Sequence, residues 1–348
     1  MRIPPTQLAL DIQDQPLALK NLIEEESDHI ADIAEQVKGD FDYVIVAARG
    51  SSDNAARYAQ YLFCAHNRLP VALATPSMFT LYGTPPALTH GLVLGISQSG
   101  QSPDIVAVLE EAHRQGRPTI TLTNDPSSPL ALAADHVINL HAGPERAIAA
   151  TKTYTTSLCA LALFDAALRK DREQSDQIRR IPGLIHRTLK EFEPLIPRVE
   201  RYRYMAHCVV IGRGYNYSTA FEIALKVKEL TRIVAEPCSS ADFRHGPIAM
   251  VGDGFPIFII APSGRVADDM AQLVQEIIKR RGEILAISDR AELLEQAQFA
   301  LPIPSDIPEW LTPIVAVVPG QLFSLALALS KGYDPDQPFG LHKVTETL

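Results

Sequence analysis

The chain has 348 residues, of which 46% are hydrophobic and 21% are charged, and this composition fits a globular protein with two domains of ordinary size. Its formal net charge of −9 at pH 7 argues against nucleic acid or an acidic membrane surface as a partner. No apolar run reaches ~18 residues, and the N-terminal sequence MRIPPTQLALDIQDQP lacks a signal-peptide core, so we expect a cytoplasmic protein. The four cysteines have no metal-like spacing, which predicts reduced thiols and no zinc site or disulfide framework. We expect no cofactor.

The first half of the chain is predicted to be a helical segment followed by an α/β domain. Residues 1–36 carry apolar side chains at helical spacing, with a break expected near Pro16. In residues 37–168, short apolar runs without alternation predict strands that are buried on both faces of a parallel sheet. These runs are Tyr43–Ala47, Pro70–Ala74, Leu92–Ile96, Thr119–Thr123 and His136–Leu140. A helix is expected over Asp104–Gln115.

The second half repeats this organisation after a charged connector. Residues 169–200 are predicted to form the connector, with a helix in it, and residues 333–348 an extended tail rich in proline and glycine. In residues 201–332, strands are expected at Cys208–Ile211, Ile257–Ile260, Ile284–Ile287 and Phe299–Ile303, and a helix at Ala267–Arg280. The alternation of strands and helices predicts two tandem, doubly wound, parallel-sheet domains of the flavodoxin-like kind.

Two dipeptides at strand ends recur at a fixed distance of 164 residues. The matching pairs are Arg49-Gly50 with Arg213-Gly214, and Ser99-Gly100 with Ser263-Gly264. In the first copy, the residues before that glycine are Ser97, Gln98 and Ser99, whereas the second copy has Ala261, Pro262 and Ser263. Proline has no N–H to donate and alanine has no hydroxyl. The contrast predicts one ligand site per chain, built on the first repeat.

Polar loops after the strands of the first repeat are typical of a phosphate site. Hydroxyls and N–H groups at a helix N-terminus surround a phosphate dianion, although an ordinary helix cap is the plainer interpretation of either loop alone. Ligands in such sheets bind at the carboxyl ends of the strands, where these loops fall. The substrate-binding residues that we expect are Gly50, Ser51, Ser52, Ser97, Gln98, Ser99, Ser102, Ile148 and Ala149.

Taken together, the loops resemble the sugar isomerase (SIS) domain family of phosphosugar-binding proteins. The pattern is a strand followed by G-[ST]-S, a strand followed by S-x-S-G-x-[ST]-x-D, and then A-x-T-K. In the second half, FEIALKVKEL (Phe221–Leu230), DFRHGP (Asp242–Pro247) and DPDQPFGLHKVT (Asp334–Thr345) resemble the isomerase half of glucosamine-6-phosphate synthases. The glutaminase half of those synthases has no counterpart here, so we expect that the chain does not release ammonia from glutamine unaided.

The resemblance implies the roles of the catalytic residues. Glu229 matches the base that moves a proton between C1 and C2, and Lys226 shares its helix face with Glu222. A solvated charged face is the alternative interpretation of these three. His245 matches the ring-opening histidine, which enters the neighbouring subunit's site, so a homodimer with shared sites is implied. Lys343 matches the lysine that forms a Schiff base with the open-chain ketose.

Several positions depart from the synthase pattern. Phe339 and Gly340 replace Arg-Asn, and His342 replaces the alanine before the lysine. The tail is more similar to stand-alone amino-sugar phosphate deaminases and deglycases, in which residues near Glu236 and Ser239–Ser240 bind the amine end. We therefore expect a hexose or hexosamine 6-phosphate substrate, with glucosamine 6-phosphate converted to fructose 6-phosphate and ammonia. Ammonia-dependent synthesis, deglycation and a sugar-phosphate sensor remain as alternatives, and a nicotinamide dehydrogenase is disfavoured because no G-x-G-x-x-G turn is present.

Overall fold

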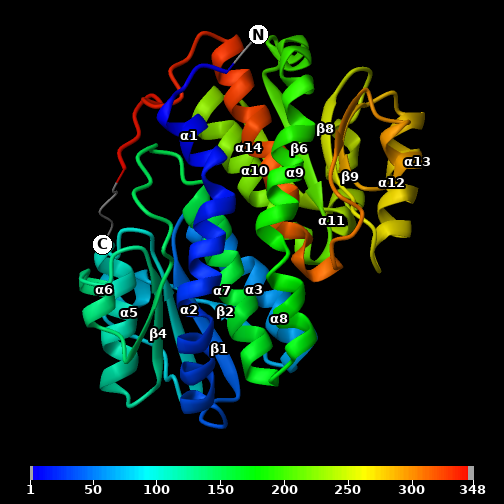
Figure 1. Cartoon of the computed structure of the whole chain (residues 1–348). Helices are drawn as coiled ribbons and strands as arrows, with labels where there is room; N and C mark the ends of the chain where they lie inside the picture. Colours follow the sequence, from blue (N-terminus) through cyan, green and yellow to red (C-terminus); the bar gives the residue numbers. More distant parts are fainter. Residues whose placement is uncertain (1–2, 344–348) are drawn as a thin grey trace. The chain divides into compact units, whose positions relative to one another are not determined.

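The computed structural model describes residues 3–343, and these form two compact units (Figure 1). The first-repeat unit contains residues 17–145, 152–180 and 342–343. The second-repeat unit contains residues 3–16, 146–151 and 181–341. The chain therefore crosses between the units five times, and each unit is described by itself below.

The first-repeat unit is built on a five-stranded parallel sheet in the order β2-β1-β3-β4-β5. Its strands are β1 (Tyr43–Ala48), β2 (Val71–Leu73), β3 (Gly91–Ile96), β4 (Thr119–Thr123) and β5 (His136–Asn139). Its helices are α2 (Gln15–Val37), α3 (Ser51–Asn67), α4 (Ser77–Thr80), α5 (Pro103–Arg114), α6 (Pro129–Leu132), α7 (Lys152–Arg169) and α8 (Arg172–Ile178). This strand order is that of flavodoxin-like folds, which confirms the predicted fold class.

The second-repeat unit repeats this topology, with its parallel strands in the order β10-β9-β8-β6-β7. The strands are β6 (His207–Gly212), β7 (Val234–Ser239), β8 (Pro256–Ile260), β9 (Glu283–Ser288) and β10 (Phe299–Pro302). The α-helices are α1 (Gln7–Gln13), α9 (Ile181–Phe192), α10 (Tyr217–Thr231), α11 (Ser240–Arg244), α12 (Ala267–Lys279), α13 (Ala291–Leu294) and α14 (Thr312–Ser330). Short 3-10 helices are η1 (Glu193–Tyr202), η2 (Gly214–Asn216), η3 (Pro247–Met250) and η4 (Glu309–Leu311).

The edge strand β7 was missing from the sequence expectation. It contains Glu236 and Pro237, two residue types that are depleted in strands. Proline is tolerated at a sheet edge because no further strand needs its N–H, and β7 is the edge strand beside β6.

An apolar core covers each face of the second sheet. On one face, α12 packs against β8 and β9 through a buried cluster that includes Met270, Leu273 and Ile277. On the other face, Phe323 of α14 makes edge-to-face contacts with the rings of Phe258 and Tyr202, at centroid distances of 4.9 and 5.5 Å. Burying each such ring stabilises the fold by about 1.5–3 kcal/mol.

Helix α14 corrects one expectation from the sequence. Within residues 3–343, the stretch Glu309–Ser330 is long and apolar enough to cross a membrane by length and composition, with a mean hydropathy of 1.8. The apolar window is entirely buried inside the protein, so α14 is a core helix. Small and polar residues such as Gly320, Gln321 and Ser324 interrupt the apolar run, which is why a count of consecutive apolar residues missed it.

Candidate functional site

The carboxyl end of β1 opens directly into α3. Gly50 caps this helix in a left-handed conformation, with a φ of 56°, which a residue with a side chain adopts only with strain. Ser51 and Ser52 follow as the first two helical residues and are half-buried. Their position places two hydroxyls beside the N–H groups of the first helical turn, where an anion is stabilised.

The carboxyl end of β3 leads into a loop in which one serine stabilises the turn and the others are half-buried at its surface. Ser97 is buried, and its Oγ accepts a hydrogen bond from the N–H of Gly100 at 3.1 Å, which closes the turn. Gly100 has a φ of 62°, and a Cβ there would collide with the side chain of Ser128. Ser99 and Ser102 are half-buried, and Ser102 stands at the N-cap of α5 without a side-chain capping bond. The Ser102 hydroxyl is thus not committed to capping the helix.

An ion pair joins the two loops. The Arg49 guanidinium donates from Nε to Asp104 Oδ2 at 2.8 Å, and its Nη2 lies 2.6 Å from the same oxygen. Asp104 is completely buried in the first turn of α5, whereas half of the Arg49 side chain is exposed. The pair fixes the end of β1 to the start of α5 and leaves a cationic group at the edge of the site. Both residues of this ion pair were visible in the sequence, Arg49 in the repeated Arg-Gly pair and Asp104 in the loop pattern. The sequence did not indicate that they contact each other.

The equivalent loop of the second-repeat unit is occupied by the protein's own carboxylates. The N–H of Ser263 donates to Asp289 Oδ1 at 2.6 Å. A Cβ on Gly264 would collide with the side chain of Glu309. Two carboxylates therefore contact this loop, and their negative charge disfavours an anion there. The loss of anion binding in this copy stays a prediction.

Helix α10 carries a buried charged cluster along one face. Lys226 Nζ lies 2.6 Å from Glu229 Oε2 and 3.5 Å from Glu222 Oε1. Glu222 and Lys226 are completely or almost completely buried, and the Glu229 side chain is 22% exposed. The burial excludes a solvated charged face. Glu229 is the member of this cluster that reaches solvent, so it is the carboxylate that a substrate could contact.

His245 is exposed at the C-terminal end of α11, on a loop held by its neighbour. The Arg244 guanidinium donates to Asp269 Oδ1 at 2.9 Å and to Glu276 Oε1 at 3.1 Å, both on α12. The backbone N–H of His245 donates to the carbonyl of Asp242 at 3.0 Å. These bonds fix the backbone at His245 and leave its ring outside the packed core.

The serines that precede this loop serve the local structure. Ser239 caps α11 by accepting the N–H of Asp242 at 3.1 Å, and Ser240 donates to Asp269 Oδ2. Glu236, by contrast, is exposed on β7. A role of these residues toward an amine stays a prediction.

Asp11 fixes the first residues of the segment 146–151, which precedes α7. In the second-repeat unit, Asp11 Oδ2 accepts the N–H groups of Arg146 and Ala147 at 3.0 and 2.9 Å, just before Ile148, which is half-buried, and Ala149, which is buried.

In the first-repeat unit, Glu145 accepts hydrogen bonds from the N–H and the Oγ1 of Thr153 at 3.1 and 2.6 Å, at the start of α7. Lys343 Nζ lies 3.2 Å from Glu145 Oε2, and the Glu145 side chain is fully buried. Sequence reasoning gave no role to Asp11 or Glu145.

Each unit therefore gathers its own part of the predicted site. The first-repeat unit holds the serine loops and Lys343, and the second-repeat unit holds Lys226, Glu229, His245, Ile148 and Ala149. Among residues 3–343, no group of three or more histidine, cysteine or acidic residues is arranged to hold a metal ion.

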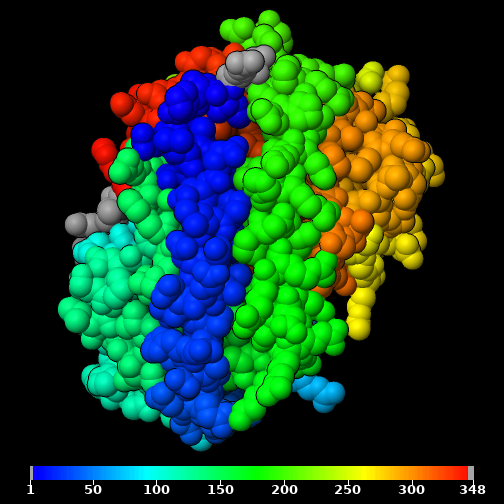
Figure 2. Space-filling view, viewed as in Figure 1, coloured from blue at the N-terminus to red at the C-terminus, as the bar shows by residue number. Residues whose placement is uncertain are grey.

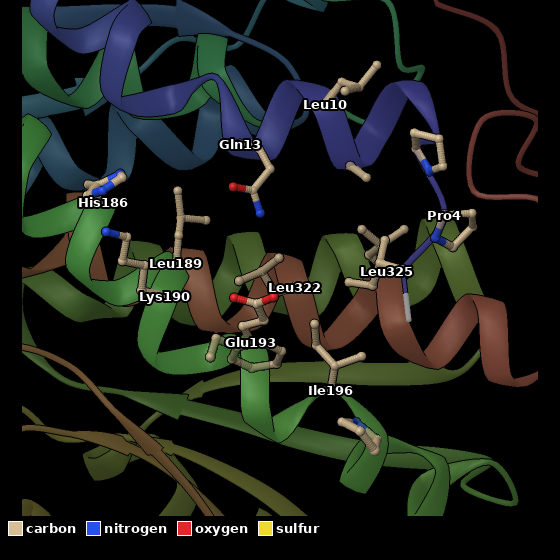
Figure 3. A pocket seen from close by; sticks show the side chains of 15 residues that line it. Pro4, Leu10, Gln13, His186, Leu189, Lys190, Glu193, Ile196, Leu322 and Leu325 are labelled. Carbon is tan, nitrogen blue, oxygen red and sulfur yellow. The ribbon is translucent and has the colours of Figure 1, made fainter. Parts of the chain in front are cut away.

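Three cavities lie away from all of these residues. One, of about 750 Å³, is a groove between α1, the α9–η1 segment and α14. Figure 2 shows α1 on the surface beside α9. In Figure 3, Gln13 of α1 points toward Lys190 of α9 and Leu322 of α14, whereas the Leu10 side chain points away from them. The others, of about 860 and 440 Å³, are in the first-repeat unit, at α2–α8 and beyond β4 and β5. None of these cavities is lined by a predicted site residue, so we locate the candidate site by the loops that follow β1 and β3.

Comparison with known proteins places both repeats in one family. The sequence pattern of the SIS domain matches residues 42–167 and 204–331. The isomerizing glutamine–fructose-6-phosphate aminotransferase of Thermococcus kodakarensis is 34% identical over 97% of this chain, which covers 58% of that protein. The chain thus spans a little over half the length of this relative.

Solved structures agree with this similarity. A candidate phosphosugar isomerase from Silicibacter pomeroyi has a TM-score of 0.87 and 31% identity, over 95% of this chain and 100% of that one. The C-terminal domain of glucosamine-fructose-6-phosphate aminotransferase from Francisella tularensis has a TM-score of 0.86 and 27% identity, over 96% and 99% of the two chains. The resemblance seen in the sequence is confirmed, and the chain belongs to the SIS domain family.

Proposed function

We propose that this chain is a phosphosugar isomerase that converts glucosamine 6-phosphate and water to fructose 6-phosphate and ammonia. The observation that carries the proposal is the difference between the two copies of the β3-type loop. The first copy presents the hydroxyls of Ser99 and Ser102 at the start of α5, whereas Asp289 and Glu309 occupy the second. A chain that keeps one of two duplicated anion sites open is suited to a single phosphorylated ligand.

In the proposed reaction, the phosphate binds at the two serine loops and His245 assists opening of the sugar ring. Glu229 then removes the proton from C2 of the open-chain aldehyde, and the electron pair forms a C1–C2 double bond. The π bond of the C1 carbonyl breaks at the same time and its oxygen takes up a proton, which gives an enolamine. Return of a proton to C1 gives a C2 imine, to which water adds, and the C–N bond breaks to release ammonia. The sum is redox-neutral, so the reaction needs no oxidant or reductant. Lys343 forms a Schiff base at C2 of the ketose and so provides a covalent route to and from the imine.

A second candidate is the reverse direction, in which ammonia and fructose 6-phosphate give glucosamine 6-phosphate. The aminotransferases among the relatives favour it, because their names specify fructose 6-phosphate. Phe339 and His342, which stand where the synthase pattern has other residues, favour the deaminase direction or deglycation of another amine adduct. A sensor that binds the sugar phosphate without turnover is the remaining alternative.

The direct test is to incubate the purified protein with glucosamine 6-phosphate and to follow fructose 6-phosphate and ammonia together. A parallel reaction contains fructose 6-phosphate with ammonium, and a third contains fructose 6-phosphate with glutamine. We expect fructose 6-phosphate and ammonia in equal amounts in the first reaction, and no glucosamine 6-phosphate in the third. Binding of the sugar phosphate without any turnover would refute the enzyme and support the sensor.

The matched control is Glu229→Gln, which is nearly isosteric and keeps an oxygen near Lys226. It should bind fructose 6-phosphate normally, because the serine loops are unchanged, and should lose turnover by about 10²-fold or more, the usual contribution of a general base. Full activity of Glu229→Gln would remove Glu229 from the mechanism.

A further inference from the structure

The segment that follows α14 is attached to the second-repeat unit. Asp336 accepts the N–H groups of Gln7 and Leu8 at 2.8 and 2.9 Å, so its carboxylate lies at the start of α1. Pro335 and Pro338 are buried. The segment that leads to Lys343 is therefore attached to the second-repeat unit through Asp336 and the two buried prolines.

Arg232 is the group that fixes the end of this segment. It terminates α10 in a left-handed conformation, with a φ of 59°, and its N–H donates to the carbonyl of Lys228 at 3.0 Å. Its guanidinium carbon lies 4.7 Å from the centre of the Tyr333 ring and 4.6 Å from the centre of the Phe339 ring. Both distances are within the range of a cation–π interaction. Phe339 is 79% exposed, so core packing does not hold this ring.

The chain turns directly after Phe339. The N–H of Leu341 donates to the carbonyl of Pro338 at 3.3 Å, and Gly340 between them has a φ of 75°, as the third residue of a type II turn requires. Lys343 follows two residues after this turn. The contact of Phe339 with Arg232 thus fixes the start of the turn that leads to Lys343.

We propose that Arg232 is a positioning residue for Lys343, acting through Tyr333 and Phe339, and that it couples the lysine-bearing tail to the helix that carries Glu229. This inference rests on the proposed function. Glu229 lies three residues before Arg232 on α10. The proton-transfer group and the anchor of the tail are therefore attached to the same end of one helix.

The expected effect follows from the strength of the two contacts. Loss of two exposed cation–π interactions changes the docking equilibrium of the tail by roughly five- to thirtyfold. Arg232→Ala and Phe339→Leu should each lower kcat, Arg232→Ala by about this factor, with KM changed by less than about twofold because the phosphate loops are untouched. Arg232→Lys, which keeps the charge without the planar group, should retain part of the activity.

The decisive variant exchanges the two partners. Arg232→Phe combined with Phe339→Arg keeps a ring and a guanidinium at the same two positions, and it should restore kcat to within about threefold of wild type. In a Lys343→Ala background, Arg232→Ala should cause no further loss, because the two residues act as one unit. Hydrogen exchange of the peptide 333–343 should be faster in Arg232→Ala and slow again in the exchanged variant.

The outcomes separate this inference from the function on which it rests. An active wild type with an unimpaired Arg232→Ala variant, or an exchanged pair that does not recover, overturns the role of Arg232 alone. Additive losses from Arg232→Ala and Lys343→Ala would show that Arg232 acts on something other than the lysine, and would also overturn it. A wild type that turns over neither glucosamine 6-phosphate nor fructose 6-phosphate with ammonium overturns the proposed function, and the role of Arg232 in turnover with it.

Discussion

Lys343 Nζ lies 3.2 Å from Oε2 of Glu145, a buried carboxylate that also binds the N–H and hydroxyl of Thr153 at the start of α7. The carboxylate thereby holds the lysine against a fixed helix N-terminus. The Lys343 side chain is 29% exposed, so it remains accessible to a ligand while it contacts Glu145.

Covalent and electrostatic roles of Lys343 are separated by two substitutions. Lys343→Arg keeps a cation beside Glu145 but cannot form a Schiff base, and Lys343→Ala loses both properties. If the lysine is covalent, both variants should lose most turnover, and borohydride with fructose 6-phosphate should label Lys343 only in the wild-type chain. The label is read by peptide mass spectrometry. Wild-type rates in Lys343→Arg would reduce the role of the lysine to its charge.

The serine loop of the first repeat should carry phosphate affinity. Ser99→Ala with Ser102→Ala removes two charge-assisted hydrogen bonds worth roughly 1.5–3 kcal/mol each. We expect the affinity for fructose 6-phosphate, measured by calorimetry, to fall at least about tenfold with an unchanged melting temperature. Ser263→Ala in the second repeat is the matched control and should leave the affinity unchanged. Equal effects of the two changes would contradict the asymmetry of the loops.

The charged cluster of α10 should depend on its lysine. Lys226→Met leaves the buried Glu222 without its ammonium neighbour, and loss of one partner of a buried ion pair costs about 3–5 kcal/mol of unfolding free energy. Glu229→Gln should cost less, because that side chain is partly exposed. Urea denaturation of both variants tests this order, and a Lys226→Met protein as stable as wild type would disprove it.

A homodimer with shared sites stays a prediction, and mixing tests it. His245→Ala and Glu229→Gln chains, each inactive alone, should recover part of the activity after subunit exchange if one site takes these residues from different subunits. Light scattering should give the mass of a dimer. Either a monomeric mass or a lack of recovery after proven exchange would speak against shared sites.

Thiol reactivity should follow burial. Burial raises the pKa of Cys159 and Cys208 to about 12 and that of Cys238 to about 11, the last also through Glu236 and Asp242. The thiolate is the reactive form, so these three thiols should resist alkylation at pH 8 in the native protein. Cys64, which is exposed, should be modified first, and peptide mapping identifies the site. Rapid labelling of Cys159 without unfolding would show that its environment is open.

The sequence predicted both sheets because buried parallel strands leave continuous apolar runs such as those of β3 and β8. It could not predict β7, whose Glu236 and Pro237 are compatible with a strand only at a sheet edge. Similarly, the serines of the site were visible as a motif. The Arg49–Asp104 pair and Glu145 beside Lys343 were not, since each depends on residues brought together by the fold across 55 and 198 positions.

The carboxylate of Asp289 limits the binding of dissolved anions at the second loop, because it already accepts the N–H of Ser263. Asp289 is tethered to the same unit as the Ser263 N–H that it binds, so it competes with dissolved anions as an intramolecular ligand. Effective concentrations of tethered groups reach the millimolar range, so phosphate at lower concentration does not displace it. The loop of the second sheet also differs from the first in its backbone, because Gly264 has a φ of 152° where Gly100 has a φ of 62°. Replacing Asp289 with a neutral residue would therefore release the Ser263 N–H without rebuilding the loop geometry of the first repeat, so a second anion site needs changes in the backbone as well.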